Sequence, residues 1–595
     1  MGAPALAQTH EAAFGVARSF SGRRWTLNHA GDGAVQALMH AGNISEPLAH
    51  ILTLRGVTAE TLEDALAPTL KRLLPEPFLL KDMEKAVARV KAAIETGETI
   101  AVFGDYDVDG SASAAILFDF LSALGRPPRV YIPDRMTEGY GPNAAALLKL
   151  KEEGASLVIT VDCGSGAAKP LQAARDAGLD VMILDHHAVD VPPPAVAHVN
   201  PNQPGDASGF NHLCAAGVTF LFTVALNRAL REAGWYQANG IAEPDLRNAV
   251  DLVGLATHCD VVPLLDVNRA FIRGGLAKLG ARPGLAALSA IAKIAPPFTS
   301  HHLGFILGPR INAGGRVGRA GLGVDLLTAR DPALAQELAA QLDLHNGERQ
   351  ALEKLILAEA VAEAATQSNA PFILTAGEGW HTGVVGIVAG RLKDRFGKPA
   401  FAIGMEGGVG RGSARSVAGI DVGAVVRAAH ERGVIESGGG HAMAAGFSLR
   451  GDQVDGFSAF LSEAFANSAA ALAAASEMFI DALVSPAGAT VNLIEEIAKA
   501  GPFGPGNQEP LIAIPDARIA FADPVGKDHV RLQLAGADGA RVAAIAFRVA
   551  DQPLGRALLA ARGQRIHVAG RLRADEWNGQ TRVQLQIEDA APAGV

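Results

Sequence analysis

The sequence predicts a multidomain α/β protein that combines parallel β-sheets with a separate small β-barrel. Three observations support this fold class. A chain of 595 residues is too long for one core and suits three or four domains. From residue 98, short apolar runs alternate with Ala- and Leu-rich helical stretches, the pattern of β-α-β units. The C-terminal part instead alternates apolar and polar positions, which is typical of antiparallel strands.

The first predicted domain spans residues 1–330, including an N-terminal extension. Its apolar runs have the length and composition of buried parallel strands. They are TIAVFG (99–104), RVYIP (129–133), LVITV (157–161) and VMIL (181–184). With intervening helices, for example at 112–124 and 170–177, these runs predict a doubly wound sheet over about residues 95–200 and helical additions beyond it.

A long connecting helix is predicted for residues 331–369. Asp331 can cap it, Pro332 suits the first helical position, and leucines then recur at helical spacing, with Asn346-Gly347 as a candidate break. A smaller α/β domain follows at residues 370–472. Its expected elements are a strand at 372–376, a helix at 384–396 and glycine-rich segments at 408–416 and 437–446.

Residues 473–595 are predicted to form a barrel of the OB type, which begins with a helix at 490–499 and the loop GPFGPGNQEP (501–510). OB barrels hold single-stranded nucleic acid by basic residues and aromatic stacking. Aromatic residues are few here, so arginines are expected to grip the backbone. The candidates are Arg541, Arg548, Arg571 and Arg573.

Charge and cysteine content narrow the class of protein. Lys plus Arg total 52 against 62 Asp plus Glu, so the formal net charge of −10 argues against a general polyanion-coating protein. Three isolated cysteines favour a reducing interior and hence the cytoplasm. We find no signal-peptide pattern and no apolar run of about 18 residues, so no membrane association is expected. A three-domain monomer is expected.

Acidic residues and histidines follow the predicted strands of the first domain. Because parallel strands point their carboxyl ends in the same direction, these side chains are expected to converge in one cleft. They are Asp107 and Asp109 in GDYDVDG, Asp162 in VDCG, His186 and His187 in LDHH, and, from a later apolar stretch, Asp260 in THCDVVPL.

Two other interpretations of GDYDVDG compete with a metal site. A calcium EF-hand loop counted from Asp105 would need Glu at position 12, where Ile116 stands, and would follow a helix rather than a strand. A solvated turn that caps the next helix stays open as an alternative. Asp105 is left open as a ligand or a supporting residue, and His187 as a site residue or a buried, hydrogen-bonded histidine.

Four carboxylates and a histidine, with no thiolate set, suit Mn²⁺ or Mg²⁺ better than structural zinc. Crowded carboxylates repel one another unless cations neutralise them. Two ions about 4 Å apart suit in-line attack on phosphorus. The sequence therefore predicts two divalent ions and hydrolysis of a phosphodiester.

The motifs GDYDVDG, VDCG, LDHH, CDVVPL, GPRINAGGR and GGGHAMAAG, in this order, resemble those of the DHH phosphoesterase superfamily. Within it they are similar to the 5′-to-3′ exonucleases specific for single-stranded DNA, from about residue 50 to the C-terminus. The resemblance implies a parallel-sheet DHH domain, a substrate-binding DHHA1 domain, a role in DNA repair and recombination, and a helicase and a single-strand-binding protein as partners. The metal ligands that it implies are Asp107, Asp109, Asp162 as a bridge, His186 and Asp260.

Two positions depart from the superfamily pattern. Phe103 stands where many small-substrate relatives have a histidine, four residues before the first metal-binding aspartate. This favours the exonuclease branch over the oligoribonuclease and cyclic-dinucleotide branches and leaves one metal with fewer protein ligands. His258-Cys259 precede Asp260 where small apolar residues are expected.

Candidate substrate-binding residues lie in glycine-rich segments, which are either flexible loops or places where guanidinium groups and backbone amides hold phosphates. The resemblance implies that arginines of the first domain hold a 5′-terminal phosphate and that His441 contacts a phosphate near the cleavage point. His301-His302 matches no motif and is predicted to be loop. The candidates are Arg135 in 132–141, Arg310 and Arg316 in 308–321, Arg411, Ser413 and Arg415 in 408–416, and His441 in 437–446.

The predicted activity is metal-dependent 5′-to-3′ degradation of single-stranded DNA to 5′-mononucleotides, with the metals and His187 or His441 stabilising charge on the phosphoryl oxygens. Two alternatives remain. An oligonucleotide or cyclic-dinucleotide phosphodiesterase is disfavoured by Phe103 and the added barrel. A non-catalytic single-strand-binding replication factor with a degenerate DHH domain is disfavoured by the complete set of carboxylates and histidine.

Overall fold

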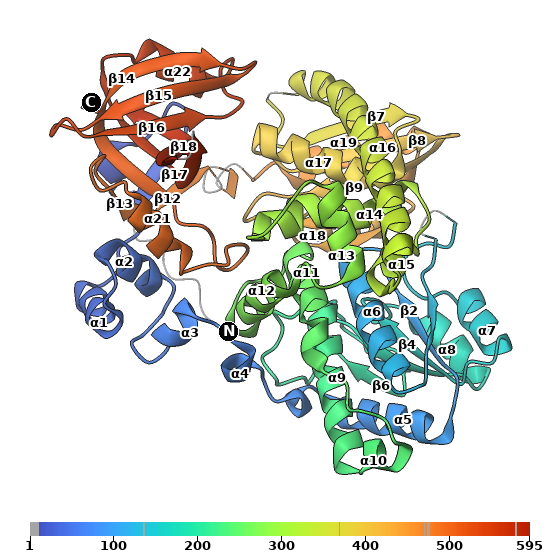
Figure 1. Cartoon of the computed structure of the whole chain (residues 1–595). Helices are drawn as coiled ribbons and strands as arrows, with labels where there is room; N and C mark the ends of the chain where they lie inside the picture. Colours follow the sequence, from blue (N-terminus) through green and yellow to red (C-terminus); the bar gives the residue numbers. More distant parts are fainter. Residues whose placement is uncertain are drawn as a thin grey trace. The chain divides into compact units, whose positions relative to one another are not determined.

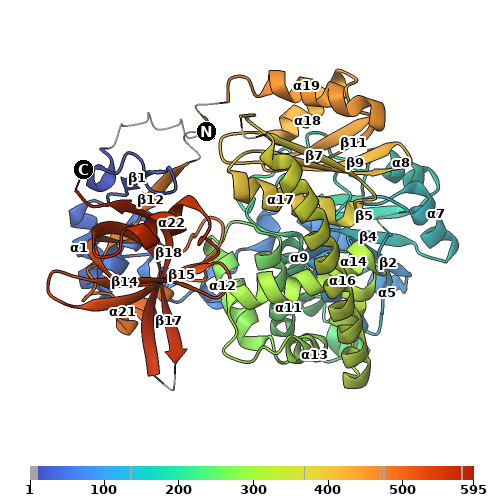
Figure 2. The same ribbon diagram turned by 90° about the horizontal axis from the view of Figure 1, so that it is seen from above.

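The computed structural model describes residues 11–134, 137–367, 369–468, 471–472, 476–577 and 580–594. The chain divides into two compact units (Figures 1 and 2). One contains residues 67–351 and 502–508, and the other contains residues 1–66, 352–501 and 509–595. Across the described residues, every helix is too short or too polar to traverse a lipid bilayer.

A five-stranded parallel sheet, in the order β3-β2-β4-β5-β6, forms the centre of the first unit. Its strands are β2 (Ile100–Gly104), β3 (Arg129–Tyr131), β4 (Leu157–Val161), β5 (Asp180–Leu184) and β6 (Ala197–Val199). The predicted parallel sheet is therefore confirmed. The strand β6 was not predicted from the sequence.

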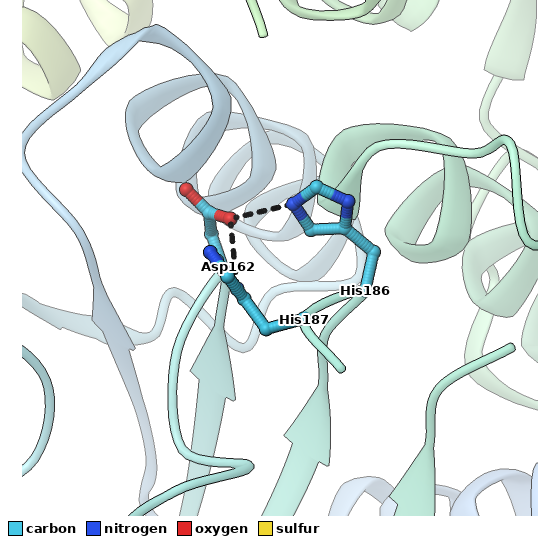
Figure 3. A group of neighbouring side chains, drawn as sticks. All are labelled: Asp162, His186 and His187. Carbon is cyan, nitrogen blue, oxygen red and sulfur yellow. Dashed lines mark ion pairs between the residues drawn. The ribbon is translucent and has the colours of Figure 1, made fainter. Parts of the chain in front are cut away.

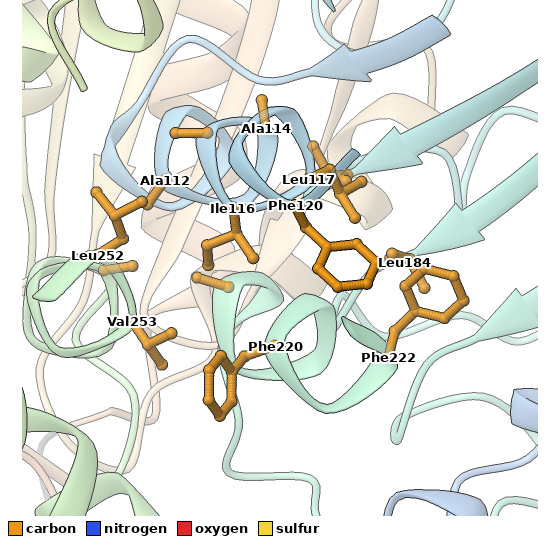
Figure 4. Close-up of a cluster of buried hydrophobic side chains, with 14 of the residues drawn as sticks. Ala112, Ala114, Ile116, Leu117, Phe120, Leu184, Phe220, Phe222, Leu252 and Val253 are labelled. Carbon is orange, nitrogen blue, oxygen red and sulfur yellow. The ribbon is translucent and has the colours of Figure 1, made fainter. Parts of the chain in front are cut away.

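Helices cover both faces of this sheet, because alternate strand residues enter two separate cores. Val102 packs in a core with α5, α6 and α9, whereas Phe103 packs in another with α7 and α8. Figure 4 shows side chains of α6, α9 and α11 meeting in the first core, among them Ile116, Phe220 and Leu252. The helices are α4 (Leu70–Leu73), α5 (Met83–Thr96), α6 (Val108–Ala123), α7 (Ala144–Glu152), α8 (Ala168–Asp176), α9 (Ala215–Glu232), α10 (Trp235–Asn239) and α11 (Val250–Cys259).

The remaining helices of this unit include the histidine pair, which the sequence predicted as loop, and the arginine segment, for which a flexible loop was one of two interpretations. The histidine pair enters a π-helix at His302–Leu307, and most of the arginine segment forms α14 (Gly308–Val317). Gly315 of α14 faces the ring of Tyr106, whose Cδ2 would lie 1.9 Å from an added Cβ, so the glycine serves close packing. The other helices are α12 (Asp266–Lys278), α13 (Pro283–Ile291) and α15 (Leu322–Thr328).

The predicted connecting helix is α16 (Pro332–Ala365). It continues through the candidate break at Asn346-Gly347, where Oδ1 of the buried Asn346 accepts hydrogen bonds from the guanidinium of Arg349. Apolar residues near its start, such as Leu338, belong to the core of the parallel-sheet domain. Ile356 and Ala360 belong to a core of the next domain. Packing at both ends therefore stabilises the helix.

The second sheet has the order β10-β11-β9-β8-β7, with one parallel pair, β7 and β8. Its strands are β7 (Ile373–Glu378), β8 (Ala400–Glu406), β9 (Val409–Arg415), β10 (Ser437–His441) and β11 (Ala444–Arg450). Most of the first glycine-rich segment forms β9, and the second forms β10, a two-residue turn and the start of β11. Residues of α17 (Thr382–Phe396) and of α18 (Val422–Glu431) with α19 (Val454–Ala464) enter two separate cores.

The C-terminal sheet has the order β13-β14-β15-β16-β18-β17, and an additional pairing of β14 with β17 closes a five-stranded barrel, which confirms the predicted OB-like fold. Its elements are β13 (Ala482–Leu483), α21 (Val491–Ala498), β14 (Ile512–Val525), β15 (His529–Ala535), β16 (Arg541–Ala546), α22 (Pro553–Ala560), β17 (Arg565–Trp577) and β18 (Gln580–Pro592).

The described N-terminal segment packs with the barrel, although the sequence pattern attached it to the first domain. β1 (Arg24–Leu27) pairs in parallel with β12 (Glu477–Ile480). The fully buried Trp25 donates its Nε1 hydrogen bond to Asp589 at 3.0 Å. Sequence periodicity cannot reveal such a pairing between distant segments. Three helices follow β1: α1 (Asp32–Gly42), α2 (Glu46–Leu54) and α3 (Leu62–Leu66).

Candidate functional site

The carboxylates of GDYDVDG are held by local backbone structure. Asp107 caps α6, and its side chain accepts a hydrogen bond from the amide of Gly110 at 3.0 Å. Asp109, in the first turn of α6, is 1% exposed and accepts the amides of Ala215 and Ala216 at 2.7 and 2.8 Å. These two amides belong to the first turn of α9, whose positive dipole end favours a carboxylate. Asp109 is therefore immobilised between two helices.

Asp162, His186 and Asp260 meet Asp109 at the carboxyl edge of the parallel sheet. Nε2 of His186 lies 3.5 Å from Oδ1 of Asp162, 3.5 Å from Oδ2 of Asp260 and 3.8 Å from Oδ2 of Asp109. Figure 3 shows the two histidine rings beside the Asp162 carboxylate. Asp162 follows β4 directly, and Asp260 lies at the C-terminal end of α11. The structure thus brings together residues separated by about 150 positions in the sequence.

Three overlapping groups of donor atoms at this edge have the geometry to hold divalent ions. Within each group, all ligand atoms lie within 4.8 Å of one another. The groups are Asp105, Asp107 and Asp162; Asp109, His186 and Asp260; and Asp162, His186 and His187. Their donors are carboxylate oxygens and imidazole nitrogens, which suit Mn²⁺ or Mg²⁺.

Electrostatics indicate that this cluster needs a cation. Burial and the nearby charge of Asp107 raise the pKa of Asp109 to about 7. Burial, followed by the neighbouring carboxylates, raises the pKa values of Asp162 and Asp260 well above the ordinary range. In addition, the buried Oδ2 of Asp260 receives no hydrogen bond from any described residue. The residues present therefore fit divalent ions, which would neutralise the repulsion.

His187 is held as a cation by Asp185. Its Nδ1 lies 2.8 Å from Oδ1 of Asp185, and this carboxylate also accepts the backbone amides of His186 and Ser165. Burial alone would lower the pKa of His187, but the hydrogen bond and charge of Asp185 raise it to about 9. Burial alone would raise the pKa of Asp185, but the same bond and the two imidazoles hold it well below its ordinary range.

Sequence reasoning assigned no role to several residues that support the site. Oδ1 of Asn312 accepts a hydrogen bond from the amide of Val108 at 2.9 Å, between Asp107 and Asp109. Nδ2 of Asn200 donates to the carbonyl of His187 at 2.8 Å, and the Tyr140 hydroxyl donates to the carbonyl of Asp162 at 3.1 Å. Asn312 lies within the motif GPRINAGGR, which could have identified it as a site residue, but only the arginines of that motif were considered. Tyr140 lies in the 132–141 segment, of which only Arg135 was considered, whereas Asn200 carried no such signal.

The departures from the superfamily pattern have simple structural consequences. Phe103 is fully buried and stacks on Tyr131 with ring centroids 5.3 Å apart, so its side chain offers no ligand atom to the site. His258 and Cys259 form the end of α11, with Asp260 as its C-cap. The Cys259 sulfur packs against Gly308, where an added Cβ would lie 2.5 Å away. Asp260 reaches the cluster despite these unexpected neighbours.

The structure places the first-domain arginines as follows. Nε of Arg310 donates to Asp343 at 2.8 Å and its Nη1 donates to the carbonyl of Ile306 at 2.8 Å, so this guanidinium already holds internal partners. Arg316 lies in the last turn of α14 and is partly exposed. Arg135 lies outside the described residues. A role for these arginines at a 5′ phosphate stays a prediction.

Four candidate residues of the second sheet share one face. Arg411, Ser413 and Arg415 alternate along β9, and the register continues from Arg415 through Ala444 to His441. Directly opposite residues of antiparallel strands project to the same side. The structure therefore brings together the side chains predicted from two separate glycine-rich segments.

Two glycines leave the backbone of this face uncovered by side chains. Ser413 stands opposite Gly446, which stands opposite Gly439, and an added Cβ at either glycine would meet no atom within 4 Å. Gly386 of α17 adjoins the same face, since its added Cβ would lie 3.1 Å from Nη2 of Arg415. We call the face formed by Arg411, Ser413, Arg415, His441, Gly439 and Gly446 the glycine cradle. It combines donors with exposed backbone, as phosphate recognition requires.

Barrel arginines are partly engaged by acids. Both Arg571 and Arg573 form ion pairs with Glu509. Arg541 donates to Gln533 at 3.4 Å, and Arg548 has a left-handed backbone with φ of 57°. The first two arginines are therefore less suited to bind a phosphate backbone than their charge alone suggests.

Comparisons with known proteins agree with the motif order. The family model "DHH family, N-terminal domain" matches residues 99–256, "DHHA1 domain" matches 369–467 and "RecJ OB domain" matches 480–589. Among solved structures, RecJ from Thermus thermophilus in complex with Mn²⁺ has a TM-score of 0.79 and 29% identity, covering 95% of this chain and 79% of that chain. The Mg²⁺ complex of that protein has a TM-score of 0.72 and 27% identity, covering 96% and 79%.

Curated relatives align over nearly the whole chain. The single-stranded-DNA-specific exonuclease RecJ of Bacillus subtilis (strain 168) is 33% identical over 578 residues, which are 96% of this chain and 71% of the relative. The protein of the same name from Escherichia coli (strain K12) is 34% identical over 559 residues, which are 90% of this chain and 94% of the relative. Together with the three family models, these alignments show that the chain belongs to the RecJ family of DHH phosphoesterases.

Proposed function

We propose that the chain is a metal-dependent exonuclease that degrades single-stranded DNA from 5′ to 3′ by phosphodiester hydrolysis, releasing 5′-mononucleotides. The observation that carries the proposal is the convergence of four side chains at one edge of the parallel sheet: Asp109, Asp162, His186 and Asp260. It is supported by a relative, a single-stranded-DNA-specific exonuclease, to which the chain is 33% identical over 578 residues. A role in DNA repair and recombination follows from the same family membership.

Bound Mn²⁺ or Mg²⁺ would supply Lewis-acid stabilisation of the phosphoryl group and activate the attacking water. The residues proposed to hold two such ions are Asp107, Asp109, Asp162, His186 and Asp260, with Asp162 shared between them. His187 is positioned by Asp185 to donate a charged hydrogen bond to a phosphoryl oxygen, and in the metal-free protein Asp185 raises the pKa of His187 to about 9.

Substrate binding is assigned to all three domains. In this proposal residues 370–472 bind the DNA backbone through the glycine cradle, and residues 473–595 hold the single strand through the OB barrel. Arg135, Arg310 and Arg316 are proposed to anchor a 5′ phosphate, which would make the enzyme act from an end. A monomer in the cytoplasm, supplied with substrate by a helicase and a single-strand-binding protein, completes the proposal.

One degradation experiment tests this function. The protein is incubated with Mn²⁺ and uniformly labelled single-stranded DNA, with and without a 5′ phosphate, beside a duplex, a dinucleotide and a cyclic dinucleotide. We expect mononucleotides from the single strand alone. Preferential cleavage of either dinucleotide would favour the small-substrate phosphodiesterase, and binding without cleavage would favour the replication factor.

Metal binding should depend on pH in a defined direction. The raised pKa of Asp109, about 7, means that the folded metal-free protein loses stability as pH rises from about 4 to 7, because buried carboxyls must ionise side by side. Mn²⁺ should therefore raise the Tm more at pH 8 than at pH 5.5, and EDTA should reverse the gain. Differential scanning fluorimetry measures this, with Asp109→Asn as the variant whose metal-free Tm should depend less on pH. Equal Mn²⁺ effects at both pH values would contradict the assignment.

A further inference from the structure

A tight turn at residues 502–508 belongs to the compact unit of the parallel-sheet domain, although it lies within the stretch matched by the RecJ OB domain model. Gly504 and Asn507 exchange backbone hydrogen bonds of 3.0 and 3.1 Å. Nδ2 of Asn507 donates to the carbonyl of Pro502 at 2.8 Å, and Asn507 is only 5% exposed. The turn is therefore closed by its own bonds and presents a fixed surface.

That surface fits closely against Pro263 and Leu264. The amide of Leu264 donates to the carbonyl of Pro505 at 2.7 Å. An added Cβ at Gly504 would lie 2.7 Å from Cδ1 of Leu264, and one at Gly506 would lie 3.1 Å from Cβ of Pro263. Gly506 also has φ of +69°, a left-handed conformation that a side chain strains. The absence of a side chain at both glycines therefore lets the turn pack closely against Pro263 and Leu264.

The contacted segment begins at the metal-centre residue Asp260. Asp260 ends α11, and Val261 follows with φ of 62°, a conformation that a β-branched residue adopts only when its surroundings impose it. From the other side, Nδ2 of the buried Asn268 donates to the carbonyl of Pro263 at 2.9 Å. The chain reversal after Asp260 is therefore held between Asn268 and the 502–508 turn.

We propose that the 502–508 turn is a positioning element for Asp260 and thereby sets the metal affinity of the centre. The turn touches no substrate or reacting atom in this proposal, and it acts by fixing the backbone that aims the Asp260 carboxylate. The inference rests on the proposed function only in taking Asp260 as a metal ligand.

The test measures Mn²⁺ binding to the full-length, DNA-free protein by electron paramagnetic resonance of the unbound ion. Asn507→Ala removes the bond that closes the turn, and Gly506→Ala pushes the turn away from Pro263. Both variants should raise the Kd for Mn²⁺ about tenfold, the usual effect of losing a group that orients a ligand. The matched control is Gly240→Ala, because Gly240 has φ of +64° and its added Cβ would meet no atom within 4 Å. Its Kd should equal that of the wild type.

Activity separates a positioning role from a merely structural one. In both turn variants, the Mn²⁺ concentration for half-maximal cleavage should rise while the KM for single-stranded DNA at saturating Mn²⁺ stays unchanged. A Kd for Mn²⁺ within twofold of the wild type in either folded variant would overturn the proposal, as would a lower Tm with an unchanged Kd. If Asn507→Ala does not fold, the Kd of Gly506→Ala provides the test. Because the binding measurement contains no DNA, its result is independent of whether the wild type degrades single strands.

Discussion

Asp162→Asn is expected to abolish exonuclease activity and, at the same time, to make the metal-free protein more stable. Asp162 belongs to two of the three donor groups, so its loss disturbs both proposed ion positions. Losing several kcal/mol of charge stabilisation lowers kcat by about 10³-fold. The gain in stability follows from the pKa of Asp162, which burial and neighbouring carboxylates raise well above its ordinary value. A neutral amide of the same shape removes that repulsion.

Two measurements check the Asp162 prediction. The kcat is determined with labelled single-stranded DNA at saturating Mn²⁺, and thermal unfolding is followed at pH 8 in EDTA, where the wild-type carboxylates are most strongly charged. Asp455→Asn is the control, because Asp455 is an exposed residue in the first turn of α19. It should change neither quantity. Full activity in Asp162→Asn would remove the assignment of the metal centre.

His187→Ala is expected to lower kcat by about 10² to 10³-fold, the usual cost of removing a donor aimed at developing charge. It should also remove the alkaline limb of the pH profile. In the metal-free protein the pKa of His187 is raised to about 9. Bound cations would lower this pKa, so wild-type activity should fall as pH rises through the lowered value. Mn²⁺ binding should be little affected if His187 acts as a donor, whereas a large loss of Mn²⁺ affinity would make it a ligand.

Asp185→Asn gives a second variant for the same residue. Without the Asp185 charge, the pKa of His187 should fall towards the ordinary imidazole value of about 6.5. The alkaline loss of activity should then begin at a lower pH than in the wild type. His430→Ala, at an exposed position in the last turn of α18, is the control and should leave the pH profile unchanged. An unaltered profile in Asp185→Asn would show that His187 does not titrate in the reaction.

Some of the site could be predicted because its geometry is a property of parallel sheets. Asp162 and His186 follow consecutive buried strands, and strands of one parallel sheet end at one edge, so their convergence follows from the β-α-β period alone. The glycine cradle was predicted only in part. Its residues were recognised as two segments, but their common face depends on the register of β9, β11 and β10, which the sequence does not show.

Other features depended on long-range contacts. The guanidinium of Arg310 pairs with Asp343, and the described N-terminal segment pairs with β12, so neither environment could be read from local pattern. The histidine pair matches no motif and was predicted as loop, but it enters a π-helix. A flexible loop was one interpretation of the arginine segment, and that segment forms α14, in which Gly315 packs closely against Tyr106.

The sequence by itself determined the α/β class, the order of the domains, the RecJ family and the chemical types of the ligands, because periodicity and motifs are local properties of the chain. Tertiary structure alone decided how the carboxylates act together. It brought Asp260 from the end of a helix to His186, set Asp109 against the first turn of α9, and placed the 502–508 turn beneath the segment after Asp260. Interactions between charges and contacts of buried backbone depend on distances of a few ångströms, which only the folded chain defines.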